Sequence, residues 1–368
     1  MSYQNVGTPR FYVSWGDYWK SLGTTVNKLH TLNPSQESTD FYMNSAATDK
    51  FYSSSIPYPT ACNGINFYAV LGHNIANYPD ATQYFSMKQQ VDNSWQEDIL
   101  IDGTTHSMEL NTGSGATPQS NGFSIGVISQ ADGYVSGNPY IATGIRKTAN
   151  QGGLHINNEN RAKINSFVFG KTYDMPHSPD LSLKLSYEMD GVKNIQTKGG
   201  ATLSNASYTK PADWGSGGAW QLGNSSTSAN YDFSKNYRSG RRVWDLSFSY
   251  LSDSDIMPSM GVTNNLHSMG QYTSDNLIDD FGYTTDDVST SAVSTDGAFR
   301  ENVLISNDFF SQVWNKTMGG HLPFIFQPNG NLHLADQFAI ARFDQSSLQY
   351  DQVAHNTYNV KLKIRESW

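Results

Sequence analysis

The fold class follows from the stretch Val243-Trp244-Asp245-Leu246-Ser247-Phe248-Ser249-Tyr250, in which apolar and polar residues alternate. Successive side chains of a β-strand point to opposite faces, so this alternation predicts a strand with one buried face and one wet face. The same pattern occurs in residues 181–187 (LSLKLSY) and 358–365 (YNVKLKIR). Charged residues on the wet face of the last strand would discourage pairing with other molecules: Lys361, Lys363 and Arg365.

Further strands are expected in short apolar segments between loops rich in Gly, Ser, Asn and Pro: Asn66–Gly72, Phe123–Ile128, Ile164–Phe169 and Leu322–Phe326. Short strands with long polar loops favour antiparallel sandwiches over a parallel α/β sheet. Helices are expected at Asn307–Thr317, which has capping residues before it and Gly319-Gly320 after it, and at Asp17–Leu22 before Gly23. The sequence therefore predicts a mainly β protein: two antiparallel β-sandwich domains with long loops and one or two short helices.

The domain boundary is placed at residues 173–180, where two prolines interrupt regular structure. This division gives an N-terminal aromatic arm at 1–30, one sandwich at 31–176 and a second at 177–368. The second contains two expected long loops, 198–236 and 261–297, the latter rich in aspartate. Loops of this length are uncommon in a compact domain unless they function or bind a neighbour.

The composition limits the possible functions. The 368 residues carry a net charge of −9, and 15% are charged, against roughly a quarter in an average soluble domain. Aromatic residues make up 13%, which supplies core-forming surface and argues against global disorder. A single cysteine excludes an internal disulfide framework and a cysteine zinc site. We also expect no nucleic-acid partner, no signal peptide and no membrane span, since apolar runs stay below the ~18 residues that a span needs.

Catalytic and metal-binding motifs are weak. Gly122-Phe123-Ser124-Ile125-Gly126 matches the nucleophile-elbow pattern of esterases, but its alternation favours a continuous strand. The nine histidines form no helical metal pair. Asp253-Ser254-Asp255 is similar to the start of a calcium loop, yet Ile256-Met257-Pro258 replaces the expected ligands. The sequence therefore predicts no catalytic residue, no cofactor and no metal site.

Aromatic clusters are better candidates for contact with other molecules. One lies at residues 11–19, and the Gly-rich segment further on contains Trp214 and Trp220. Such residues stack on sugars, and they are also enriched at protein interfaces. The plainer interpretations are a packed core edge for residues 11–19 and an interface anchor for Trp214 and Trp220. We favour burial against another chain over sugar binding, and Trp214 and Trp220 are the candidates for a glycan or partner contact.

Two sets of segments resemble known proteins. An apolar strand entering Gly72-His73-Asn74, with Ile164–Gly170 later in the chain, resembles discoidin-like β-sandwich modules of tailed-bacteriophage structural proteins. Glycine permits positive φ and asparagine tolerates it, so this resemblance implies a structural turn at Gly72, His73 and Asn74.

The second set resembles distal-tail and related baseplate components of phage tail tips. It comprises a basic start and a W-x-L-x-F strand at 241–250, a short helix at 308–314, a P-x-x-F strand at 322–326 and the terminal strand 360–368. The resemblance implies a virion protein that binds copies of itself and other tail proteins and contributes to host attachment. It would be made in the host cytoplasm.

Two alternatives stay open. One is a carbohydrate-binding β-sandwich that recognises a host surface glycan, and the other is an esterase or glycoside hydrolase. Experiments can distinguish both alternatives from a virion protein. Carbohydrate binding requires exposed aromatic residues, and hydrolysis requires Ser124 as a nucleophile or a pair of carboxylates.

Overall fold

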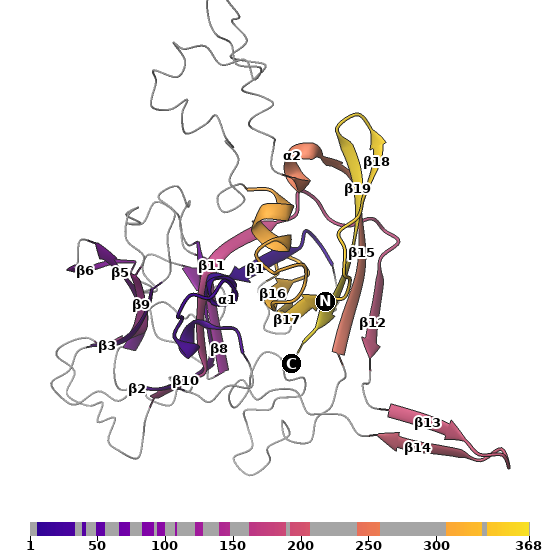
Figure 1. Cartoon of the computed structure of the whole chain (residues 1–368), viewed down its shortest axis with the longest axis horizontal. Helices are drawn as coiled ribbons and strands as arrows, with labels where there is room; N and C mark the ends of the chain where they lie inside the picture. Colours follow the sequence, from indigo (N-terminus) through magenta and orange to yellow (C-terminus); the bar gives the residue numbers. More distant parts are fainter. Residues whose placement is uncertain are drawn as a thin grey trace, which may run out of the picture.

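The computed structural model describes residues 6–33, 39–41, 49–55, 66–73, 83–91, 94–99, 107–108, 122–127, 140–147, 162–188, 192–206, 241–257, 307–332 and 337–367. In these residues the protein is mainly β, as predicted, with one large antiparallel sheet, three smaller sheets and short helices (Figure 1).

The large sheet takes strands from both halves of the chain. Its order is β12 (Lys184–Glu188), β15 (Arg241–Ser252), β19 (Thr357–Glu366), β17 (Ala339–Phe343), β16 (Phe324–Gln327), β1 (Arg10–Ser14), β11 (Ser166–Asp174), β4 (Phe67–His73), β8 (Gly122–Val127) and β7 (Ser107–Met108), while β18 (Tyr350–Ala354) pairs with β19. β1 pairs with β11 on one side and with β16 on the other. Strands of the regions 31–176 and 177–368 therefore meet in one sheet, through a strand from residues 1–30.

The alternating strands bury the residues that the sequence predicts. In β15, Trp244, Leu246 and Phe248 are buried while Asp245 is exposed. In β19, Val360, Leu362 and Ile364 are buried between outward charged residues. Pairing between β15 and β19 brings these two apolar rows together.

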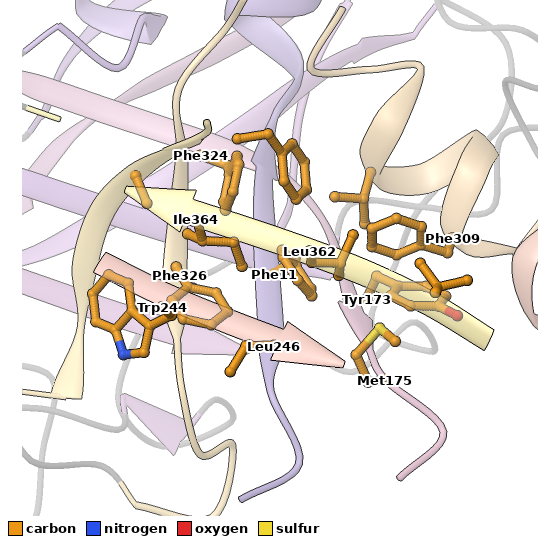
Figure 2. Packing of buried hydrophobic residues seen from close by; sticks show 14 of the residues in the cluster. Phe11, Tyr173, Met175, Trp244, Leu246, Phe309, Phe324, Phe326, Leu362 and Ile364 are labelled. Carbon is orange, nitrogen blue, oxygen red and sulfur yellow. The ribbon is translucent and has the colours of Figure 1, made fainter. Parts of the chain in front are cut away.

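An aromatic core forms around Phe11 on one face of the sheet. Its ring centroid lies 5.6 Å from that of Phe309, 5.5 Å from that of Phe324 and 5.3 Å from that of Phe326 (Figure 2). On the other face, Tyr12 packs against Phe67 at 5.2 Å. The N-terminal aromatic cluster is thus buried in the chain's own core through Phe11, Tyr12, Val13 and Trp15, which agrees with a core position and not with burial against another chain. The core around Phe11 covers one face of β1 and the core around Tyr12 covers the other, so these side chains have no surface left for a partner.

Both predicted helices are present. α1 (Trp15–Ser21) begins two residues before the predicted start, because Ser14 accepts a hydrogen bond from the Asp17 backbone and caps it. The other is a π-helical segment (Phe310–Trp314), in which the Asn315 N–H donates to the Phe310 carbonyl at 2.7 Å. Asp308 caps its start by accepting from the Ser311 N–H at 2.8 Å.

Two further short helices lie at η1 (Lys28–His30) and α2 (Asp253–Ile256). In α2, the calcium-loop-like Asp255 accepts from the Ser252 backbone at 3.0 Å, so its carboxylate caps the helix.

The smaller sheets complete the described part of the chain. One has four strands, in the order β3 (Asp49–Ser55), β9 (Tyr140–Lys147), β5 (Gln83–Val91) and β6 (Ser94–Ile99). Another pairs β10 (Ala162–Ile164) with β2 (Thr39–Phe41). The third is a hairpin of β13 (Val192–Gln196) and β14 (Thr202–Ala206). β14 lies inside the predicted loop 198–236, so that part of the loop prediction was wrong. Leu203 is the one large apolar residue of this strand, which leaves too short an apolar pattern to recognise.

Candidate functional site

The predicted contact residues Trp214 and Trp220 lie outside the residues that the structure describes, as does Asn74. Gly72 has a φ of +62°, which confirms the expected positive φ. A Cβ at this position would lie 2.6 Å from the Cβ of Asn165, so the site requires glycine on steric grounds also.

Gly72 and His73 form no turn, however, because β4 continues through both. Leu71 pairs with Phe123 and His73 with Gly122, which leaves Gly72 as the extra residue of a β-bulge. The prediction of a turn at Gly72 and His73 was therefore wrong: left-handed glycine suits a bulge as well as it suits a turn. His73 is fully buried.

The esterase-like segment 122–126 forms strand β8, with Ser124 opposite Val70 of β4. A nucleophile elbow requires a sharp turn between a strand and a helix at the serine. The backbone at Ser124 is extended and paired, which confirms the interpretation of this segment as a continuous strand.

No group of three or more His, Cys, Asp or Glu residues that could hold a metal ion occurs in the described part of the chain. No helix there is long and apolar enough to cross a membrane.

A pocket of about 570 Å³ opens between α1, the segment that follows η1, and strand β17. Its lining is a mixture of charged, polar and aliphatic groups: Asp17, Lys20, Ser21, Thr31, Leu32, Asn33, His321, Leu322, Pro323, Ile340, Arg342 and Ser367. The volume falls within the range of about 300–1,000 Å³ that small-molecule sites occupy. The lining comes from residues 17–33 and residues 321–367, two regions far apart in the sequence, and no motif connects them.

Asp17 is the one acidic residue in the lining of this pocket. Its Oδ2 accepts a hydrogen bond from the Leu32 N–H at 2.7 Å, which ties α1 to the segment after η1. Burial raises the pKa of the Asp17 carboxyl, while Ser14, the Leu32 N–H, Lys20 and Arg342 partly counter that effect. Across the pocket, Arg342 donates through Nη1 to the His321 carbonyl at 2.5 Å. Lys20 and Arg342 thus share the lining with a single, partly buried carboxylate.

His30 lies in a second, closed polar site. Its Nδ1 is 2.6 Å from Ser54 Oγ of β3, and its Nε2 is 2.7 Å from Thr143 Oγ1 of β9. Burial lowers the pKa of His30 to about 3, so the ring is neutral at ordinary pH. All three side chains are buried, and the site connects η1 to the four-stranded sheet. Sequence reasoning missed it because nothing in the sequence distinguishes His30 from the other histidines.

The β13–β14 hairpin is an exposed element, because residues 194–196 and 202–204 of its two strands are all exposed. It projects away from the other described strands (lower right of Figure 1). Ile195 and Leu203 lie directly opposite each other across its two strands and are 63% and 59% exposed. On the other face, Asn194 lies opposite Ser204, and both are exposed. Ile195 and Leu203 therefore form an exposed apolar pair on one face of the hairpin, and the pair of Asn194 and Ser204 on the opposite face is polar.

A second exposed group is Tyr250 in β15. Its φ is +63°, which is rare for an aromatic residue, and it lies in a bulge between Phe248 and Leu251. The Asn359 side chain accepts from the Tyr250 N–H at 3.2 Å, and the Tyr250 residue is 79% exposed. The bulge turns this ring outward between two buried neighbours.

Comparisons with known proteins add no relative. The chain matches no protein-family model, and neither the curated proteins nor the solved structures include a detectable match to it.

Proposed function

We propose that this chain is a structural protein of a tailed-phage virion, which assembles with copies of itself and with other tail proteins at the tail tip and contributes to host attachment there. The observation that carries the assembly role is the β13–β14 hairpin. A two-stranded hairpin alone is marginal in water and gains stability from packing of its apolar face. Ile195 and Leu203 have no such cover within the described residues.

A copy of the same chain is the partner that the charges favour. Residues 192–206 contain two lysines and no acidic residue, whereas the whole chain has a net charge of −9. A basic hairpin on an acidic protein is attracted to a neighbouring copy. In this role the chain needs no catalytic group or cofactor.

Sedimentation of the purified protein tests the assembly role. We expect oligomers, and we expect Ile195→Lys combined with Leu203→Lys to yield smaller species. Asn194→Lys combined with Ser204→Lys is the matched control, because it adds the same charge to the polar face. A wild-type monomer at high concentration, or equal effects of both pairs, would contradict the role of this hairpin.

Mass spectrometry and imaging of purified particles test the location. We expect the chain in the virion, at the tail tip. Its absence from particles would contradict the tail assignment, whatever its state of association in solution.

Carbohydrate binding is the second candidate function, and exposed Tyr250 favours it. Aromatic rings stack on sugars, and here a bulge exposes one. A glycan array compares the wild type with Tyr250→Ala, and with Trp214→Ala and Trp220→Ala. Binding that all three variants retain would exclude aromatic stacking by these residues.

A further inference from the structure

We propose that the pocket between α1 and β17 binds a small carboxylate ligand that carries hydroxyl groups, such as an acidic monosaccharide. This proposal is independent of the tail assignment and of the exposed aromatics. It rests on the charges, the polar groups and the rigidity of the pocket.

The charges favour an anion. Lys20 and Arg342 supply two positive charges to the lining, and Asp17 supplies its one carboxylate. This local excess of positive charge occurs in a chain whose net charge is −9. Arginine and lysine bind carboxylates through charge-assisted hydrogen bonds, which are about twice as strong as neutral ones.

Polar and aliphatic groups favour a hydroxylated molecule of sugar size over a bare anion. Ser21, Thr31 and Ser367 belong to the lining. The Ser21 and Thr31 hydroxyls donate to the Tyr18 and Lys28 carbonyls, and their oxygens can accept hydrogen bonds from ligand hydroxyls. Leu322, Pro323 and Ile340 add aliphatic surface. The lining includes no Phe, Tyr or Trp, so recognition here would depend mainly on hydrogen bonds and charge instead of stacking.

Packing and hydrogen bonds fix Asp17 and Arg342 in place, while Lys20 is exposed at the pocket. A Cβ at Gly16 would lie 1.8 Å from the His30 carbonyl oxygen, so α1 rests directly on η1. The hydrogen bond from Leu32 N–H holds Asp17, and the one to the His321 carbonyl holds Arg342. A site whose groups are already in place binds without a large ordering cost.

Calorimetric titration of the full chain with D-glucuronate tests the proposal. D-Gluconate, an open-chain hydroxy acid, is the second probe, and D-glucose and acetate each lack one of the two features. We expect glucuronate or gluconate to bind, and glucose and acetate to bind much more weakly. The stronger of the two acids shows whether the pocket prefers a cyclic sugar acid or an open-chain hydroxy acid. No binding of either acid at millimolar concentration, or equal binding of acetate, would overturn the proposal.

Variants test the assigned groups with the same probes. Lys20→Gln and Arg342→Gln should each weaken binding about tenfold or more, and Arg342→Lys should weaken it less because the charge remains. Asp17→Asn should strengthen binding, because it removes a repelling charge and keeps an acceptor for the Leu32 N–H. Lys361→Gln, an exposed lysine of β19, is the control and should change nothing. Unchanged binding in both Lys20→Gln and Arg342→Gln would overturn the assignment, and unfolding curves of each variant exclude loss of the fold as the cause.

Discussion

His30 shows how burial converts an ordinary side chain into a pH-dependent contribution to stability. Its ring nitrogens have hydroxyl partners in Ser54 and Thr143, and burial lowers its pKa from 6.5 to about 3. The unfolded chain therefore binds a proton more readily than the folded chain below pH 6.5. The contribution of His30 to stability is complete above that pH and is lost as the pH falls toward 3.

We expect His30→Gln to flatten this pH dependence. Below pH 6.5, the wild type should lose up to about 1.4 kcal/mol of unfolding free energy per pH unit through His30, and the variant should not. Urea unfolding at pH 7 and pH 5 measures the difference. Parallel losses in both proteins would show that His30 is not the responsible group, even if the variant is less stable at both pH values.

The buried pair of Arg242 and Glu366 predicts a different effect. Arg242 donates to both carboxylate oxygens of Glu366, at 2.9 and 3.1 Å, and to the Phe338 carbonyl at 2.8 Å. Removing one member of a buried pair leaves an unpaired charge, so we expect Glu366→Gln to lower the unfolding free energy by about 3–5 kcal/mol.

The exposed pair of Lys363 and Asp344 is the matched control. Its atoms lie 2.7 Å apart, but both side chains are well exposed, and such pairs contribute about 0–1 kcal/mol. Lys363→Gln should therefore have little effect in the same denaturation experiment. Equal losses in the two variants would contradict the importance of burial.

At the scale of single elements, the sequence pattern revealed the strands with one wet face. β15 and β19 alternate in sequence and in burial, so their position could be predicted. β1 could not, because Phe11 and Tyr12 face two different cores and the strand has no polar face. β17, with the pattern Ala-Ile-Ala-Arg-Phe, is likewise almost wholly buried. Periodicity fails for such strands because both of their faces are covered.

The close contact between α1 and η1 predicts that a larger residue at Gly16 destabilises the fold. An alanine at Gly16 would place its Cβ against the His30 backbone, which cannot move without breaking the His30 site. We expect Gly16→Ala to cost about 1–3 kcal/mol, the range for overpacking. Gly199→Ala is the control, since no atom lies within 4 Å of its added Cβ. Thermal unfolding measures both, and equal melting temperatures would show that α1 can shift at little cost.

At the scale of the molecule, the pocket between α1 and β17 could not be predicted from the sequence. The pocket joins Asp17 to Arg342, and only the path of the sheet brings these segments together. Sequence reasoning selected aromatic residues by type, and it left residues 11–19 open between a core edge and a partner surface because an aromatic cluster looks alike in a core and at an interface. What distinguishes the two is the pairing of β1 with both β11 and β16, a long-range fact with no local signal.

This pairing leads to a prediction about the whole chain. Phe11 of β1 lies in the same core as Trp244, Phe326 and Ile364, which belong to the region 177–368. A fragment of residues 177–368 lacks β1 and exposes the edge of β16. We expect this fragment to aggregate or to unfold without cooperativity, because it loses both a strand and the central ring of its core.

Circular dichroism during urea unfolding measures this, with the full chain as the reference and Phe11→Ala as an intermediate case. Phe11→Ala should lower the unfolding free energy by about 3–5 kcal/mol, because it leaves a cavity among Phe309, Phe324 and Phe326. If the fragment unfolds cooperatively at the denaturant concentration that unfolds the full chain, residues 177–368 fold without β1, and this prediction is wrong. If cooperativity is lost, the fold of residues 177–368 requires β1. The reason is that a β-strand between two others supplies hydrogen bonds on both edges.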